Sequence, residues 1–154
     1  MEIQPGLAYT VSNDYFRRHA DPFLVMNHGS DKWGDGARPY FVAFQDRREP
    51  DIYWAVPLSS NAAKYGGVYA SAIEQRGYCD TLHFADFANR SDVWLIQNMC
   101  PITERYVTGL CMTRSGNPIV PYHKDAKEAT RKASKVLKLV QHLSLIHISE
   151  PTRR

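Results

Sequence analysis

The chain has 154 residues, 44% of them hydrophobic and 23% charged, which is the composition of a globular protein large enough to bury a core of its own. No apolar run approaches the roughly 20 residues that a membrane-spanning helix needs, and the N-terminus lacks the basic and apolar segments of a secretory signal. We therefore expect a cytoplasmic protein with no membrane partner, and the formal net charge of +3 is too mild to indicate nucleic acid by itself.

Cysteine and histidine spacing argues against a metal centre. The cysteines, Cys79, Cys100 and Cys111, are odd in number and widely separated, so neither a disulfide framework nor a zinc knuckle is indicated. The sequence contains no His-Glu-x-x-His motif and no glycine-rich Walker loop. We expect no metal ion and no cofactor.

The end of the chain differs in character from the rest. Residues 143–154 resemble a translated sequencing-adapter segment rather than evolved protein. We therefore expect a single domain over residues 1–142, followed by a non-native tail over 143–154. The natural continuation beyond His142 is then not part of this sequence.

In chain order, the first predicted elements are a strand over residues 7–11 and a short helix. Ser12 is placed to cap this helix, which runs through Arg18. Residues 21–37 contain several glycines and show neither helical nor alternating periodicity, so they are predicted to form a loop.

A hairpin and a less regular segment follow. Residues 40–44 and 52–57 read as two strands joined by a polar loop, and Pro57 is predicted to mark the exit of the second strand. Residues 61–65 are predicted to form one helical turn that ends at two consecutive glycines. Residues 68–74 are predicted to form another strand.

The second half of the chain ends in a helix. Residues 92–96 and 106–112 are predicted to be strands, with a turn over 115–118. Apolar residues then recur at intervals of three and four, which predicts a C-terminal helix with one apolar face and with the basic residues largely on the other face. That apolar face comprises Ala126, Ala129, Ala133, Val136, Leu137 and Val140. The expected fold class is α+β, strand-rich and closed by a C-terminal helix.

Four short motifs occur in a fixed order along this framework. They are Tyr9-Thr10-Val11-Ser12 with Tyr15-Phe16, Arg38-Pro39-Tyr40, Pro57-Leu58-Ser59-Ser60 and Gln97-Asn98-Met99-Cys100-Pro101-Ile102. Each motif alone is weak. Together, and in this order within one short domain, they resemble the toxins of type III toxin–antitoxin systems, the ToxN/AbiQ-like endoribonucleases.

The resemblance implies a fold, an activity and a partner. The implied fold is compact and similar to the Kid/MazF toxins, an SH3-like barrel with a C-terminal helix. The implied activity is metal-independent cleavage of cellular or phage RNA, used in phage defence, which leaves a 2′,3′-cyclic phosphate. The implied partner is a repeated, pseudoknotted antitoxin RNA that neutralises the toxin, often in a ring-like assembly. Tyr15, Arg38, Ser59 and Ser60 match the family's active-site and RNA-contact positions.

Metal-free cleavage of RNA needs a group that takes the 2′-hydroxyl proton, a group that protonates the leaving 5′-oxygen, and donors or cations for the phosphorane charge. Ser59, Ser60 and Lys64 offer donors and a cation just after an apolar strand. If a helical turn begins near Ser60, Lys64 lies at i+4 on the same face, within reach of a phosphate bound between them. The alternative is that a serine caps a turn and that the lysine is solvated.

Arg38, Tyr15 and Arg18 are further candidates. A guanidinium just ahead of a strand can grip a phosphate bidentately. Tyr15 and Arg18 fall one turn apart on the first short helix, where a tyrosine can donate to a phosphate or stack on a base. The alternatives are a surface arginine and a tyrosine whose hydroxyl is satisfied within the protein.

Further RNA contacts are expected from His83 and from two later segments. His83 is singled out because histidine titrates near neutral pH, with a structural histidine as the alternative. Gln97 and Asn98 follow an apolar strand, where they can read base edges or satisfy backbone groups. The basic face of the last helix is expected to contact phosphates or to be simply solvated, and its candidates are Lys127, Arg131 and Lys135.

One position departs from the family pattern. Members of that family commonly have a lysine two residues after the position of Ser60. This chain has Ala62 there, so Lys64 or Arg38 would have to supply the positive charge that stabilises the phosphorane. Lys64, Tyr15 and His83 are all candidates for the general base. The alternative functions are a noncatalytic RNA-binding module on the same fold and a MazF-like toxin neutralised by a protein antitoxin.

Overall fold

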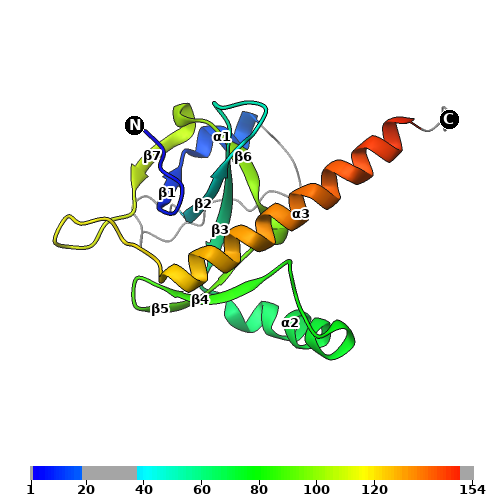
Figure 1. Cartoon of the computed structure of the whole chain (residues 1–154). Helices are drawn as coiled ribbons and strands as arrows, with labels where there is room; N and C mark the ends of the chain where they lie inside the picture. The colour runs from blue at the N-terminus through cyan, green and yellow to red at the C-terminus, as the bar shows by residue number, and fades with distance from the viewer. Residues whose placement is uncertain (1, 19–37, 150–154) are drawn as a thin grey trace.

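The computed structural model describes residues 2–18 and 38–149, with side chains over 2–15 and 38–142. No helix in these ranges is long and apolar enough to cross a membrane. In chain order the elements are β1 (Ala8–Val11), α1 (Asn13–Arg18), β2 (Pro39–Gln45), β3 (Tyr53–Ser59), α2 (Ala62–Arg76), β4 (His83–Phe87), β5 (Arg90–Trp94), η1 (Ile96–Asn98), β6 (Cys100–Ile102), η2 (Glu104–Tyr106), β7 (Val107–Leu110) and α3 (His123–Ser149) (Figure 1).

The strands form one antiparallel sheet in the order β4-β5-β3-β2-β1-β7, and β6 pairs with β3. β5 and β6 occupy successive parts of the same edge of β3, with Leu58 opposite Trp94 and Ala55 opposite Cys100. Within the described ranges the two ends of the path, β4 and β7, do not pair, so the sheet is open. The predicted α+β fold with a C-terminal helix is confirmed, whereas the SH3-like barrel of the Kid/MazF resemblance is not.

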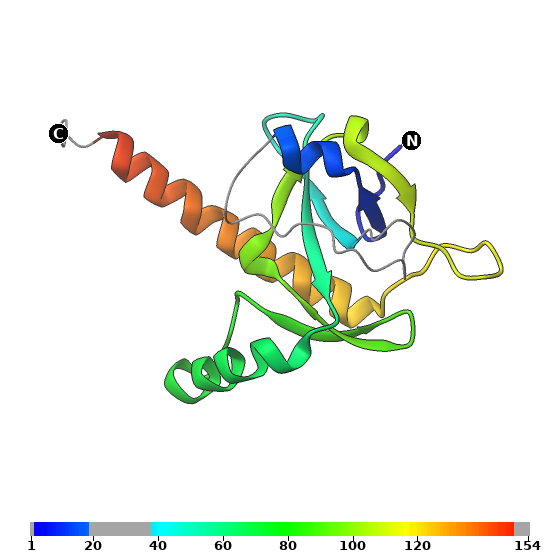
Figure 2. The same ribbon diagram turned by 180° about the vertical axis from the view of Figure 1, so that it is seen from behind.

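Alternation along the central strands divides their side chains between two faces. On one face α3 crosses the sheet, and its C-terminal half extends past the other elements (Figures 1 and 2). Ala129 and Ala133 of α3 are fully buried against Phe41, Leu58 and Trp94. These small side chains let the helix backbone approach the sheet closely.

The opposite face of β1, β2 and β3 carries a second apolar cluster. Tyr9, Tyr15, Tyr40, Val42 and Ile102 are all buried in it. The cluster therefore joins α1 and β6 to the central strands, and it lies directly behind the residues that begin β2.

α2 covers a third apolar cluster beside β5 (Figure 2). Ala72 of α2 is buried with Leu82, Val93 and Leu95, and the Tyr69 ring lies edge-on to Phe84 with centroids 5.0 Å apart. The rest of α2 is largely exposed.

The prediction of a single turn over 61–65 and a strand over 68–74 was wrong, because α2 runs unbroken through both segments. Two interior glycines cost about 1 kcal/mol each relative to alanine, which does not by itself stop a helix. The Asn61 side chain caps the first turn, and Gly77 ends the helix in the left-handed conformation at φ 80°. Packing of one helical face onto β5 offsets the cost of the glycines.

The prediction that Pro57 marks the end of its strand was also wrong. β3 continues to Ser59, although proline has no N–H for the ladder. The Pro57 carbonyl accepts a hydrogen bond from the Leu95 amide at 2.9 Å, and Leu58 then pairs with Trp94 of β5. The strand therefore extends because it changes partner at the proline.

Most other predicted elements are confirmed. The strands over 7–11, 40–44, 92–96 and 106–112 correspond to β1, β2, β5 and β7 within a few residues. The Ser12 hydroxyl accepts from the Asp14 amide at 3.0 Å, which confirms it as the cap of α1. Some details differ: β4 and β6 were not predicted, and Val140 is 53% exposed rather than packed on the sheet. The predicted loop over 21–37 lies outside the described residues.

The backbone of α3 stays helical to Ser149, past the predicted domain end at His142. The boundary between a native domain over 1–142 and a tail over 143–154 remains a prediction.

Candidate functional site

The candidate site lies where β3 ends and α2 begins. A guanidinium nitrogen of Arg38, Nη1, donates to the Leu58 carbonyl at 2.9 Å, and Arg38 and Ser59 are each only 6% exposed. Tyr40 is paired with Pro57, so the residues just before Tyr40 run alongside those just after Pro57. The sheet register thus brings the predicted residues Arg38 and Ser59 together.

A hydrogen-bonded turn leads from this point into α2. The Ser59 hydroxyl accepts from the Asn61 amide at 3.1 Å, and the Asn61 side-chain oxygen accepts from the Lys64 amide at 3.3 Å. Ser59 therefore plays the structural role that the sequence left open as an alternative. Ser60, the next residue, is exposed.

Lys64 occupies the first turn of α2, but the helical turn that was expected to begin near Ser60 begins later. The helix begins at Ala62, so Ser60 precedes it and the two residues do not share a helical face. The Lys64 ammonium lies 5.3 Å from the ring centroid of Tyr65. Tyr65 is also one of the groups that act to raise the pKa of Arg38. Sequence reasoning missed Tyr65.

Burial dominates the electrostatics of Arg38. Removal from water lowers the pKa of the Arg38 guanidinium, while Tyr40, Tyr65 and Asp92 act to raise it. Burial likewise raises the pKa of the Tyr40 phenol, which keeps it protonated. Because the pKa of arginine ordinarily lies far above neutral pH, Arg38 remains a cation at pH 7.

A buried ion pair on β5 completes the surroundings of the site. The Arg90 guanidinium grips the Asp92 carboxylate through two hydrogen bonds of 2.7 and 2.8 Å, and the Asp92 side chain is fully buried. The next residue, Val93, is paired with Ser59. Sequence reasoning missed this pair, although Arg-x-Asp on a strand places both side chains on one face.

Tyr15 lies in the cluster behind the site. Its hydroxyl donates to the Pro101 carbonyl at 2.5 Å, and its ring packs edge-on against Tyr106 with centroids 5.1 Å apart. It is 4% exposed and belongs to the same cluster as Tyr40. This arrangement favours support of the β2 end over contact with a ligand. Arg18 ends α1, and its side chain lies outside the described residues.

His83 is directed away from the site. Its Nε2 atom lies 3.1 Å from a carboxylate oxygen of Asp125 on α3, and burial lowers its pKa although the Asp125 hydrogen bond acts to raise it. His83 pairs with Trp94, which pairs in turn with Leu58, so His83 lies two strands from β3, about 10 Å across the sheet.

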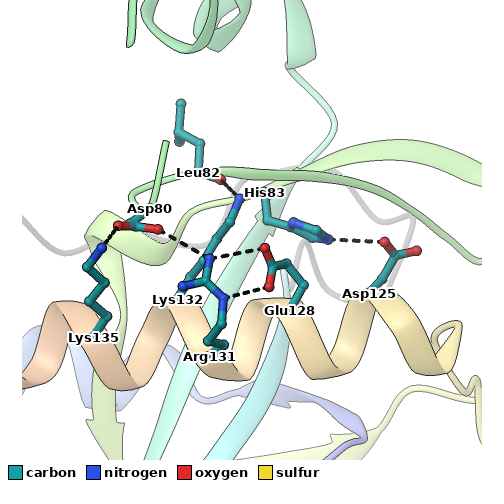
Figure 3. Close-up of polar contacts among 8 residues, drawn as sticks. All are labelled: Asp80, Leu82, His83, Asp125, Glu128, Arg131, Lys132 and Lys135. Atoms are coloured by element: carbon teal, nitrogen blue, oxygen red, sulfur yellow. Dashed lines mark hydrogen bonds and ion pairs between the residues drawn. The ribbon is translucent and has the colours of Figure 1, made fainter. Parts of the chain in front are cut away.

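Some cations of α3 bind acidic residues, as Figure 3 shows for Arg131 and Lys135. Arg131 and Lys135 both contact Asp80, at 3.4 and 2.7 Å, and Arg131 also binds Glu128. Burial by itself would raise the pKa of Asp80, but the two cations lower it overall. Lys127 is exposed and has no ion-pair partner in the part of the chain that the structure describes. Of the predicted α3 contacts, Lys127 is therefore the cation that is not already engaged.

Lys132 is buried, unlike Lys127, Arg131 and Lys135 of the same helix. Its ammonium donates to the Leu82 carbonyl at 2.8 Å, and burial lowers its pKa. It acts as a polar tie between α3 and the segment before β4, as Figure 3 shows.

Gln97 and Asn98 lie in η1, between β5 and β6. Gln97 is exposed, and its amide donates to the Thr81 carbonyl at 2.9 Å. η1 separates β5 from β6, which both pair with β3, so the η1 residues are not part of the sheet. Across the described ranges, no three histidine, cysteine or acidic side chains are grouped to hold a metal ion.

Two solved toxin structures share this fold. One is the type III toxin ToxN, selectively inhibited by a non-coding RNA pseudoknot, with a TM-score of 0.58, 17% identity, and coverage of 87% of this chain and 79% of that one. The other is AbiQ, a lactococcal anti-phage endoribonuclease of a type III system, with a TM-score of 0.56, 16% identity, and coverage of 84% and 79%. No protein-family model and no curated protein sequence matches the chain. The predicted resemblance to the ToxN/AbiQ-like toxins is thus confirmed at the level of the fold.

Proposed function

We propose that this protein is the toxin of a type III toxin–antitoxin system and that it cleaves RNA without a metal ion. The observation that carries the proposal is the contact between Arg38 and the Leu58 carbonyl, which holds a buried cation beside Ser59 and Ser60 at the start of α2. The shared fold with ToxN and AbiQ supports it.

In the proposed reaction, the RNA 2′-oxygen attacks the adjacent phosphorus while the bond from phosphorus to the 5′-oxygen breaks. The 2′-hydroxyl proton passes to a base and the leaving 5′-oxygen takes a proton, which leaves a 2′,3′-cyclic phosphate. Arg38 and the Ser60 hydroxyl stabilise the charge that develops on the phosphorane oxygens.

Lys64 is the candidate general base that the geometry favours. It is exposed in the first turn of α2, next to the serine pair. The other two candidates already make hydrogen bonds within the protein. Tyr15 donates to the Pro101 carbonyl, and His83 is hydrogen-bonded to Asp125 on α3. After it takes the 2′-hydroxyl proton, the Lys64 ammonium supplies positive charge near the position where Ala62 departs from the family pattern.

The proposed neutralising partner is a repeat RNA with a pseudoknot, and the inhibition of ToxN by a non-coding RNA pseudoknot supports this. Assembly of toxin and RNA into a ring is part of this proposal. Light scattering of the protein mixed with a repeat RNA tests it, since a ring gives one defined mass with several protein copies.

The test of the catalytic proposal is cleavage of a mixed-sequence RNA in EDTA. We expect wild type to release fragments that end in a cyclic phosphate, and Ser60→Ala and Lys64→Ala to lose about 100-fold or more in rate. Ser71→Ala, an exposed serine of α2 away from the site, is the matched control and should cleave like wild type.

A second candidate function is a noncatalytic RNA-binding module, which Ala62 favours because relatives carry a lysine there. It predicts salt-sensitive RNA binding with intact RNA after long incubation. Cleavage that is lost in Ser60→Ala but kept in Ser71→Ala excludes it.

A further inference from the structure

A groove of about 700 Å³ lies between two turns at one end of the molecule. One wall is the β4–β5 turn over residues 86–89, and the other is formed by residues 112–114 and 118–122, just before α3. Figure 2 shows the β4–β5 turn and the 112–118 segment projecting from the same end of the molecule. None of the residues predicted from the sequence to form the site lines this groove.

Both walls are built from turns with defined backbone geometry. Ala88 and Asn89 have φ values of 54° and 60°, the pattern of a two-residue hairpin turn with both positions left-handed. On the other wall Met112 is bridged to Pro118, and the Thr113 amide donates to the Asn117 carbonyl at 2.7 Å. Hydrogen bonds and strand pairing thus fix the backbone of both walls.

The groove presents large apolar side chains to solvent. Tyr122 is 64% exposed, Val120 70% and Met112 52%. The Tyr122 backbone is fixed, because its carbonyl accepts the Asp125 and Ala126 amides at the start of α3, each at 3.0 Å. An exposed aromatic ring on a fixed backbone is a platform on which a planar group can stack.

The charge around the groove favours an anionic occupant. Arg114 lies in the wall, and Lys124 and Lys127 are exposed on the first turns of α3, just after Tyr122. None of these three cations has an ion-pair partner within the described ranges, in contrast to Arg131 and Lys135 of the same helix, which bind Asp80. The carboxylate in the wall, Asp86, accepts a hydrogen bond from the Ser91 hydroxyl at 3.2 Å.

β5 connects the groove to the candidate site. Val93 of β5 is paired with Ser59, and Asn89 in the groove wall precedes Val93 by four residues. At the usual rise of a strand this is about 13 Å. A stacked nucleic-acid strand rises about 3.4 Å per nucleotide, so roughly four nucleotides cover that distance.

We propose that the groove binds unpaired nucleotides of the RNA strand that enters the Ser59–Ser60 site, with a base stacked on Tyr122 and a phosphate held by Arg114. This inference rests on the proposed function. Proteins bind single-stranded nucleic acid with aromatic rings, on which the bases stack, and with cations that contact the backbone phosphates. Tyr122 and Arg114 offer both kinds of contact.

The test measures binding and cleavage separately. Binding of a fluorescein-labelled, unstructured RNA of about eight nucleotides is followed by anisotropy, with Ser60→Ala in every chain to suppress cleavage. Tyr122→Ala and Arg114→Ala are then compared with two exposed controls away from the groove, Val68→Ala on α2 and Arg47→Ala in the β2–β3 turn.

We expect Tyr122→Ala to weaken binding about 5- to 20-fold, Tyr122→Phe to preserve it, and the controls to match the parent. Arg114→Ala should weaken binding and reduce its dependence on salt. With Ser60 restored, Tyr122→Ala should raise the KM for the longer RNA and leave cleavage of a dinucleotide unchanged, because a dinucleotide is too short to reach the groove.

Equal binding by Tyr122→Ala, Arg114→Ala and the controls overturns the inference. If wild type still cleaves the RNA in that case, the proposed function stands and only the groove assignment fails. A wild-type chain that neither binds nor cleaves RNA overturns both.

Discussion

The Arg38 guanidinium and the Leu58 carbonyl are joined by a hydrogen bond of 2.9 Å, which ties the residue before β2 to the residue before Ser59. Through this bond one buried cation supports the end of β3 next to Ser59, and the proposed reaction assigns the same guanidinium to the phosphorane charge. Structure and proposed catalysis therefore depend on the same side chain, and their contributions can be separated by mutation.

Replacing Arg38 should affect cleavage more than folding. We expect Arg38→Ala to lower the cleavage rate about 100-fold or more, because it removes a donor to the phosphorane. It should also lower the free energy of unfolding by about 1–3 kcal/mol, because the Leu58 carbonyl loses a charged donor. Parallel cleavage assays and urea denaturation measure the two effects. Arg47→Ala, an exposed arginine, should change neither, and equal losses in both Arg variants would contradict the assignment.

The buried Lys132 and the exposed Lys127 should respond differently to the same substitution. Lys132→Met leaves the Leu82 carbonyl without its donor and should cost about 1–3 kcal/mol of stability. Lys127→Met should stay within about 0.5 kcal/mol of wild type, because Lys127 is exposed and makes no ion pair in the described part of the chain. Urea denaturation at neutral pH tests the contrast, and equal stabilities would show that Lys132 does not tie α3 to the sheet.

Burial of His83 beside α3 predicts a pH dependence of stability, which its hydrogen bond to Asp125 only partly offsets. Burial holds the pKa of folded His83 below its ordinary value of 6.5, so the unfolded chain binds the additional proton. The contribution of neutral His83 is fully present above pH 6.5 and is lost as the pH falls from 6.5 toward the folded pKa. His83→Gln cannot titrate and should lose less stability between about pH 7 and about pH 5.5 than wild type does.

Denaturation curves at both pH values measure this difference. Asp125, Glu128 and Lys132 surround His83 and are unchanged in the variant, so the comparison isolates the imidazole. Identical pH dependence in both proteins would mean that His83 is not protonated on unfolding in this range.

Because α3 packs closely on the sheet, larger side chains at its buried alanines should destabilise the protein. Ala133 is fully buried, so Ala133→Leu should destabilise the protein by about 1–3 kcal/mol through overpacking. Ala70→Leu makes the same change at an exposed position of α2 and should be nearly neutral. Thermal unfolding of the two variants measures the difference, and a neutral Ala133→Leu would show that α3 can move away from the sheet.

The local pattern of apolar and polar residues predicted an element correctly where burial of one apolar face decides the structure. The strands around Phe41 and Val56 were predicted because alternating or apolar β-forming residues are bounded by polar turns. The position of Ala129 and Ala133 on the buried face of α3 was predicted because helical periodicity is strong over that segment. The failures at α2 and Pro57 came where contacts with β5, distant in sequence, outweighed local preference.

The sequence by itself determined the fold class, the ordered motifs and the chemical groups available at Ser59, Ser60 and Arg38. Only the tertiary structure decided which of those groups meet. Register between β2 and β3 brings Arg38 to Ser59, while packing of α3 commits Arg131 and Lys135 to Asp80 and leaves Lys127 exposed. The reason is that a charge is available to a ligand only where no nearby partner already holds it, and partners far apart in the chain are chosen by the folded geometry.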